Sequence, residues 1–443
     1  MVVPRCHECS KLYFVEAKQF ILREATHYSK AIAPVPSVSI TTVDQQPIVN
    51  LSSPDSTGIS SSSSSSPGGI NTSTQQQLFE RFFQVGMKRM FLSEELPEPL
   101  FLALSRQSQA FFVICVAIQA YYDDSESLAS MEHFDNALQT FQSELRLRIE
   151  TFDVSTFSAG LLLCNLCLIQ GRAWTMFLER LYILYQLETN LSHLLPEADH
   201  DPGVHNVIEV MAIMDMESMV IGRVNPSMEL WRRLRKVQEG WMSGKIGGVE
   251  MVSGMPRTLL DIIADVGLYD AQDVEARLWA WPGEVGLSVQ CLLWDCWRYT
   301  AVLDARRIDR IRKKKQAILN TMQRQPEPGP TASFPSREVI LCRLRAAIYA
   351  LYNLLGLPGS TNLPVRHGLL YPLVIGSLEV PLLNANSDWK LAFKEIRAEF
   401  LEKDPVRVTR MVDELLDEAW KEGTDTFIID EAARTRGVEI AVY

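Results

Sequence analysis

The sequence predicts an all-α fold: one large helical domain, an antiparallel bundle or array of helix pairs, that follows a disordered N-terminal tail. Through most of the region from residue 75 to residue 443, apolar side chains recur every three or four residues. This spacing places them on one face of a helix. No alternation of apolar and polar residues recurs at regular intervals, so a sheet-based fold is not expected.

The segment Met131–Glu188 is the predicted centre of this domain. It contains three consecutive helical patterns, of which the second, around Leu161–Ile169, is apolar nearly all round. A helix without a polar face is buried in a bundle or a membrane. We therefore expect this helix to lie inside the core, between two amphipathic neighbours. The first neighbour carries an apolar stripe that consists of Met131, Phe134, Leu138, Phe141, Leu145 and Ile149.

The composition restricts the class of protein. The 443 residues are 47% hydrophobic and 22% charged, which is ordinary for a globular chain. The formal net charge of −11 argues against a protein that is basic throughout and wraps nucleic acid, although it permits a small basic module. The longest uncharged apolar runs, 107–122 and 154–170, are shorter than the roughly 20 residues that span a bilayer. We expect no membrane association.

Three regions follow one another along the chain. Residues 1–33 are mixed in composition, and residues 34–74 are rich in Ser, Thr, Pro and Gly, with seven consecutive serines at Ser60–Ser66. Such a stretch cannot bury enough apolar surface to offset the entropy of ordering it, so it is predicted to be a disordered linker. Residues 75–443 form the predicted helical domain, which contains an internal loop at 325–336.

Breaks in the periodicity set the expected element boundaries. Pro97 and Pro99 end the first helix, Pro256 suits the first turn of a helix that ends at Gly267, and Asp404-Pro405 resembles an N-cap followed by a first-turn proline. The expected helices are a helix from Gln75, Ala103–Tyr122, the central helices, Val207–Ile221, Pro256–Gly267, Leu287–Met322, Leu344–Leu355, Trp389–Phe400 and Val408–Ala419.

Cys6 and Cys9 are the first candidate site. Two cysteines two residues apart supply half of a tetrahedral zinc site, but the next cysteine is Cys115, within a predicted core helix. We interpret the pair as a vestigial half-site and expect no cofactor in this chain. Zinc is expected only if a missing N-terminal module exists. Cys164 and Cys167 are predicted to pack as small hydrophobes.

Residues 306–315 form the only concentrated charge run. It contains Arg306, Arg307, Arg310, Arg312, Lys313, Lys314 and Lys315. With Asp309, its local charge is +6 in a chain that is net −11. Such a run acts as a nuclear import signal or as a nucleic-acid patch. The alternative is the solvated end of a long helix, with Ile308 and Ile311 facing inward.

The search for catalytic motifs gives one weak candidate. The sequence has no phosphate-binding glycine loop, no H-E-x-x-H and no G-x-S-x-G. Asp123-Asp124 ends an apolar helix, as the aspartate-rich motif of terpenoid synthases does. That motif needs a carboxylate three residues later, where this chain has Ser127. The chain is therefore predicted not to be an enzyme; an all-α prenyl-diphosphate enzyme and a non-catalytic helical scaffold remain the alternatives.

Several segments together resemble the regulatory domain of fungal zinc-cluster transcription factors. Trp174, Phe177, Leu178 and Leu181 match the family's W-x-x-(H/F)-L-x-x-(L/A) helix, which follows an Asp-led apolar helix. MPRTLLDIIADVGLY resembles its G-(V/M)-P-x-x-L-L segment, and HGLLYPLVIGSLEVP with RVTRMVDELLDEAW resembles its C-terminal part. The likeness runs from about Gln75 to Trp420. Each motif is loose, and their order and spacing give the match its specificity.

The resemblance implies a nuclear regulator of transcription, for example of a metabolic or secondary-metabolite gene cluster. Its implied partners are the transcription machinery or other regulators, and a small-molecule effector. Family members carry a six-cysteine zinc module with the spacing C-x2-C-x6-C, but Glu16 stands where the cysteine after Cys6 and Cys9 is required. The module is therefore expected to be absent or degenerate, and contact with DNA to be indirect. Family members often dimerise beside this module; a homodimer remains open here.

Overall fold

A computed structural model describes residues 72–90, 98–148, 152–197, 201–319, 334–355, 368–404 and 406–443. The predicted N-terminal segment 1–33 and nearly all of the predicted linker 34–74 lie outside this part of the chain. So does most of the expected loop 325–336. The first described helix begins at Thr72, three residues before the predicted boundary.

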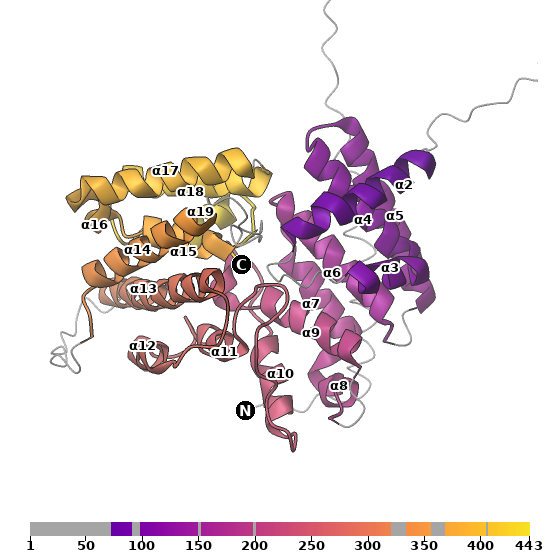
Figure 1. The fold of residues 1–443 in the computed structure, drawn as a ribbon, viewed down its shortest axis with the longest axis horizontal. Coiled ribbons are helices and arrows are strands. Elements are labelled where there is room, and N and C mark those ends of the chain that lie inside the picture. Colours follow the sequence, from indigo (N-terminus) through magenta and orange to yellow (C-terminus); the bar gives the residue numbers. More distant parts are fainter. Residues whose placement is uncertain are drawn as a thin grey trace, which may run out of the picture.

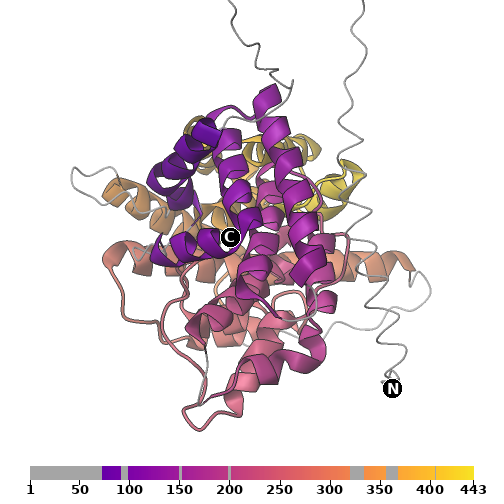
Figure 2. The same cartoon turned by 90° about the vertical axis from the view of Figure 1, so that its right-hand side faces the viewer.

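The prediction of an all-α fold is confirmed. In the described ranges the chain forms eighteen α-helices and one two-stranded sheet. Figure 1 shows the earlier helices gathered on one side of the molecule and the later ones on the other. We call α2–α9 the N-terminal half and α10–α19 the C-terminal half. Figure 2 places the N-terminal half in front, with the orange and yellow helices behind it.

The helices of the N-terminal half are α2 (Thr72–Arg81), α3 (Glu98–Gln107), α4 (Gln109–Asp123), α5 (Leu128–Arg148), α6 (Val154–Ile169), α7 (Thr175–Leu184), α8 (Leu187–Leu194) and α9 (Pro202–Met214). Those of the C-terminal half are α10 (Leu230–Glu239), α11 (Arg257–Ile263), α12 (Ala271–Ala280), α13 (Ser288–Leu319), α14 (Arg337–Leu355), α15 (Leu370–Ser377), α16 (Val380–Ala385), α17 (Ser387–Lys403), α18 (Arg407–Glu422) and α19 (Ile429–Thr435).

Helix α6 is the buried centre of the N-terminal half, as predicted. Every residue from Ser155 to Ile169 is buried except Asn165. The helix begins at Asp153, whose carboxylate accepts the backbone N–H of Thr156. At Gly160 an added Cβ would come within 2.9 Å of Leu181 on α7, so the absence of a side chain permits this close contact. α4, α5 and α7 pack around it.

Three predicted helices are shorter than expected, and one of them, predicted to end at Gly267, ends at Ile263. The helix expected to reach Glu188 ends at Leu184, because Gln186 adopts a left-handed conformation with φ of 49°. This change of direction starts α8, whose Leu187 and Leu191 are buried. The helix expected to end at Ile221 stops at Met214. There the buried carboxylate of Asp215 accepts bonds from Arg223, from the Ser227 hydroxyl and from the N–H groups of Met228 and Leu230.

The prediction that Asp404 is an N-cap is wrong. Asp404 follows the last residue of α17, and α18 begins two residues beyond Pro405, after Val406. Pro405 lies outside the described residues. Pro256, in contrast, directly precedes α11. Its extended backbone starts the helix, close to the expected position.

The two halves are joined by residues near position 440. Strand β1 (Val220–Ile221) pairs antiparallel with β2 (Ile440–Ala441). Glu439, only 1% exposed, accepts the N–H groups of Trp174 and Thr175 at the start of α7, and that of Val224. A carboxylate at a helix N-terminus is stabilised by the helix dipole. A late segment of the chain thus caps a helix of the N-terminal half.

In the part of the chain that the structure describes, no helix combines the length and the apolar character needed to cross a bilayer.

Candidate functional site

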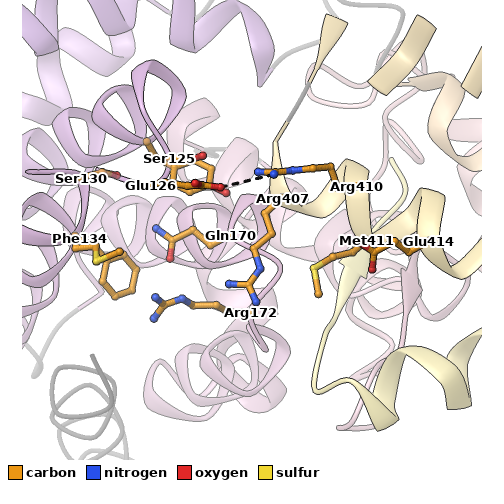
Figure 3. A pocket seen from close by; sticks show the side chains of 12 residues that line it. Ser125, Glu126, Ser130, Phe134, Gln170, Arg172, Arg407, Arg410, Met411 and Glu414 are labelled. Carbon is orange, nitrogen blue, oxygen red and sulfur yellow. Dashed lines mark ion pairs between the residues drawn. The ribbon is translucent and has the colours of Figure 1, made fainter. Parts of the chain in front are cut away.

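A polar cleft of about 490 Å³ lies where the two halves meet. Its walls come from the end of α4, from α5, from the turn after α6 and from α18. Figure 3 shows the side chains that line it. They are Tyr121, Ser125, Glu126, Ser130, Met131, Phe134, Gln170, Arg172, Arg407, Arg410, Met411 and Glu414.

The turn after α6 brings one wall of the cleft close to α18. Gly171 has φ of 63°, a left-handed conformation that glycine adopts without steric cost. The N–H of Arg172 donates to the carbonyl of Cys167, which closes the end of the helix. A Cβ at Gly171 would come within 2.6 Å of the Met411 sulfur. The glycine therefore permits both the turn and the approach of α18.

Cations from both halves face the cleft. Arg172 stands 4.7 Å from the centre of the Phe134 ring, a cation–π contact within the N-terminal half. Arg407 and Arg410 belong to the first turn of α18, where the helix dipole is positive. Arg410 pairs with Glu126 across the cleft at 3.7 Å, as the dashed line in Figure 3 shows. The side chains of Arg407 and Arg410 are exposed.

Gln170 contributes a buried polar atom to the same cleft. Its side chain is 7% exposed, and among the described residues its Oε1 atom has no hydrogen-bond partner. In Figure 3 it lies between Glu126 and Arg172. A buried amide oxygen without a partner is costly unless a ligand or a water supplies the bond.

Tyr121 adds a neutral polar group. Its hydroxyl donates to the carbonyl of Ile169. Burial raises the pKa of Tyr121 more than Arg407, Arg410 and Arg172 lower it, so the phenol stays protonated at neutral pH. Guanidinium groups bind carboxylates and phosphates through charge-assisted hydrogen bonds. The cleft is lined by three arginines, Arg172, Arg407 and Arg410, and by two glutamates, Glu126 and Glu414. This excess of positive charge favours binding of a small molecule with an anionic group.

The first part of the predicted import signal is occupied by ion pairs. On α13, Arg306 binds Glu275, Arg307 binds Asp304 at 2.8 Å, and Arg310 binds Glu379 at 2.9 Å. Arg307 is only 6% exposed. These three arginines face the packed interior of the C-terminal half.

The second part of the run lies on the surface, away from the cleft. Arg312 donates to the carbonyl of Gly267, Lys313 pairs with Asp309, and Lys315 pairs with Glu431. The Lys314 amine donates to the Thr426 hydroxyl. Exposed pairs of this kind are weak, so a partner can displace them. The accessible part of the predicted signal is therefore Arg312–Lys315.

The structure describes one of the two predicted cysteine pairs. Cys6 and Cys9 lie outside the described residues. Cys164 and Cys167 are buried in α6, and burial raises the pKa of Cys167 to about 12. A protonated buried thiol packs as a small apolar group. Within the described ranges, no three His, Cys, Asp or Glu side chains gather in a way that could hold a metal ion.

Asp123 and Asp124 lie at the end of α4, as predicted. The Asp123 carboxylate pairs with Arg81 at 3.3 Å and accepts the Gln119 amide. Asp124 accepts the backbone N–H of Glu126. Both carboxylates thus have partners that belong to the helix end and to α2.

The cleft residues were not found from the sequence. The Gln-Gly-Arg turn after α6 is a visible signal, because a glycine directly after an apolar helix indicates a turn. No sequence signal shows that α18 lies opposite this turn. Searches against protein-family models, curated proteins and solved structures give no match for this chain.

Proposed function

We propose that the chain is a regulator of transcription whose helical domain responds to a small anionic molecule bound in the cleft between its halves. The class of protein rests on the resemblance of residues 75–420 to the regulatory domain of fungal zinc-cluster transcription factors. Its partners would be the transcription machinery or other regulators, with indirect contact to DNA in the nucleus.

One observation supports the ligand-dependent part of this proposal. The cleft is lined by Arg172 and Gln170 from the N-terminal half and by Arg407 and Arg410 from the C-terminal half. A carboxylate or phosphate that binds arginines of both halves stabilises the arrangement in which they are close. A ligand shifts a conformational equilibrium by the difference in its affinity for the two states. The bound anion would therefore change which surfaces reach a partner.

Citrate and inorganic phosphate are suitable probes for the cleft. We expect at least one of them to raise the melting temperature of the full chain in a saturable way. The double variant Arg407→Ala, Arg410→Ala should weaken this binding at least tenfold, because the guanidinium partners on one wall are lost. Arg312→Ala, an exposed arginine outside the cleft, is the matched control. A wild-type protein that responds to neither anion contradicts the proposed effector site.

The transcriptional role has a separate test. The full chain is fused to an unrelated DNA-binding domain, and expression of a reporter gene with the matching sites is measured. We expect expression to rise or fall at least threefold relative to the DNA-binding domain alone. Unchanged expression, with the fusion protein present in the nucleus, contradicts a regulatory domain, whatever the anion titration shows.

A further inference from the structure

Two small compartments lie beside α6, apart from the polar cleft. The first has a volume of about 100 Å³ and lies among α3, α4, α6 and α9; the second, of about 90 Å³, reaches α17 and α18. Four residues line both compartments: Met90, Asn165, Val252 and Tyr443. Neither compartment shares a lining residue with the cleft. The two spaces are therefore neighbours.

The first compartment is mostly apolar; its polar lining residues are Ser158 and Asn165 on α6, Asn206 on α9 and Tyr443. Most of its wall consists of leucine, phenylalanine, valine and methionine side chains. Two of the polar residues, Ser158 and Asn165, belong to α6. Neither the Ser158 Oγ nor the Asn165 Nδ2 atom has a hydrogen-bond partner among the described residues. Ser158 is 6% exposed and lines this compartment.

The spacing of these two residues places both on one side of α6. Seven residues are about two helical turns, so Ser158 and Asn165 lie one above the other, roughly 10 Å apart. Asn165 is also the one residue between Ser155 and Ile169 that is not buried. It lines both compartments, together with its α6 neighbours Leu161 and Leu162 in the first and Leu168 and Ile169 in the second. Unpaired polar atoms of this kind indicate a missing partner.

The second compartment is more polar and has balanced charge. Arg89 lies 3.9 Å from Asp404 in its wall, and Thr409 lies beside them. The pair of opposite charges leaves no net charge for an anionic head group. The first compartment alone is smaller than the roughly 150 Å³ cavity that is known to bind benzene. The combined volume of the two compartments exceeds the volume of that cavity.

We propose that the paired compartments bind a small neutral amphipathic molecule, such as a medium-chain alcohol or ketone. Its oxygen lies at the boundary between the compartments, where it accepts a hydrogen bond from Asn165, and its apolar body occupies the first compartment and the adjoining part of the second. The hydroxyl of Ser158 provides a second polar contact deeper in the first compartment. This inference does not depend on the proposed anion site or on the transcriptional role.

Three ligands tested on the full chain distinguish the effects of hydrogen bonding, charge and apolar contact: 1-hexanol, hexanoate and benzene. Binding is measured by saturation-transfer NMR and by the change in melting temperature. We expect 1-hexanol to bind saturably, and hexanoate to bind at least tenfold more weakly because its charge would be buried without a free partner. Benzene should bind without any contribution from Asn165.

Asn165→Leu tests the hydrogen bond. This substitution keeps the size of the side chain and should weaken 1-hexanol binding about tenfold while benzene binding stays equal or tightens. Asn190→Leu, on α8 and outside both compartments, should leave all three probes unchanged. If Asn165→Leu does not fold, Val210→Phe, which fills the first compartment, should abolish binding of 1-hexanol and benzene. Absent 1-hexanol binding to the wild-type chain, or equal binding to the Asn165→Leu variant, overturns the proposal.

Discussion

The two halves of the molecule are both helical, but their interiors differ. In the N-terminal half the buried helix α6 carries no charged residue, and the ion pairs of Arg81 and Arg148 lie on the surface. In the C-terminal half the arginines of α13 reach the packed region and bind carboxylates there. Glu379, which is 1% exposed, accepts bonds from both Arg310 and Arg337.

This difference predicts how substitutions in each half should change the free energy of unfolding. Shortening an apolar side chain costs free energy in proportion to the volume removed. Removing one member of a buried ion pair costs more, because the remaining charge is left without its partner. The packed region around α13 should therefore depend on single charged residues, whereas the apolar packing of α6 should not. The buried Glu209 of α9, which pairs with Arg257 of the C-terminal half, belongs to the first kind.

Glu379→Ala is expected to have the largest effect. It leaves Arg310 and Arg337 with only Asp425 as an acidic partner, and should lower the free energy of unfolding by about 4 kcal/mol. Urea unfolding measures this change. Glu379→Gln keeps the hydrogen-bond acceptor and should cost less. Glu338→Ala, at an exposed position on α14, is the control. Similar stabilities for Glu379→Ala and Glu338→Ala would contradict the dependence on buried charge.

Leu166→Ala tests the apolar core of the N-terminal half. Leu166 is fully buried in α6, and its truncation should cost about 3 kcal/mol in the free energy of unfolding. Because no charge is involved, this cost should be the same at low and at high salt. Leu391→Ala, at an exposed position on α17, should be nearly neutral. A strong salt dependence of the Leu166→Ala effect would remove the contrast between the halves.

The junction between the halves should respond to pH through Glu250. Burial and the nearby Glu209 carboxylate raise the pKa of Glu250 from 4.5 to about 7, and Arg257 binds Glu209. The unfolded chain therefore loses this proton at lower pH than the folded chain does. Between about pH 4.5 and pH 7, Glu250 should lower the free energy of unfolding by about 1.4 kcal/mol for each unit of rising pH.

Glu250→Gln should remove this part of the pH dependence, as measured by urea unfolding at several pH values. The exposed Glu414→Gln should leave it unchanged. If the slope between pH 4.5 and pH 7 is the same in Glu250→Gln as in the wild type, Glu250 is not its source.

The smallest effect on stability is expected from Lys313, Lys314 and Lys315 changed together to alanine. Their pairs lie on the surface of α13, so the melting temperature should fall by less than about 2 °C. Nuclear accumulation of the tagged protein should nevertheless be lost if these lysines are the import signal. Lys390→Ala with Lys394→Ala, on α17, is the control. Unchanged nuclear accumulation would show that residues 306–315 are not an import signal and would favour the alternative, the solvated end of a long helix.

The sequence predicted the interior of the N-terminal half better than that of the C-terminal half. The burial of α6 followed from an apolar pattern without a polar face, since periodicity reports burial directly. The ion pairs of Arg306, Arg307 and Arg310 could not be predicted, because their carboxylate partners other than Asp304 come from distant parts of the chain. A charge run looks solvated in the sequence whether or not acidic residues meet it in the fold.

The cleft also depends on contacts between residues that are distant in the sequence, so it could not be predicted. Gly171 marks a turn in the sequence, but its closeness to Met411 depends on the position of α18 in three dimensions. The helix breaks at Gln186 and Asp215 were also missed. Gln186 is not a residue type that usually adopts positive φ, and the partners of Asp215 lie up to fifteen residues further on.

The contact of Glu439 with the start of α7 has a consequence for synthesis on the ribosome. The N-terminal half leaves the exit tunnel first, yet the N–H groups of Trp174 and Thr175 meet their acceptor only after residue 439 is made. At about 5–20 residues per second, the delay is on the order of tens of seconds. Until then β1 also lacks β2, and the nascent half presents a surface that a chaperone could cover.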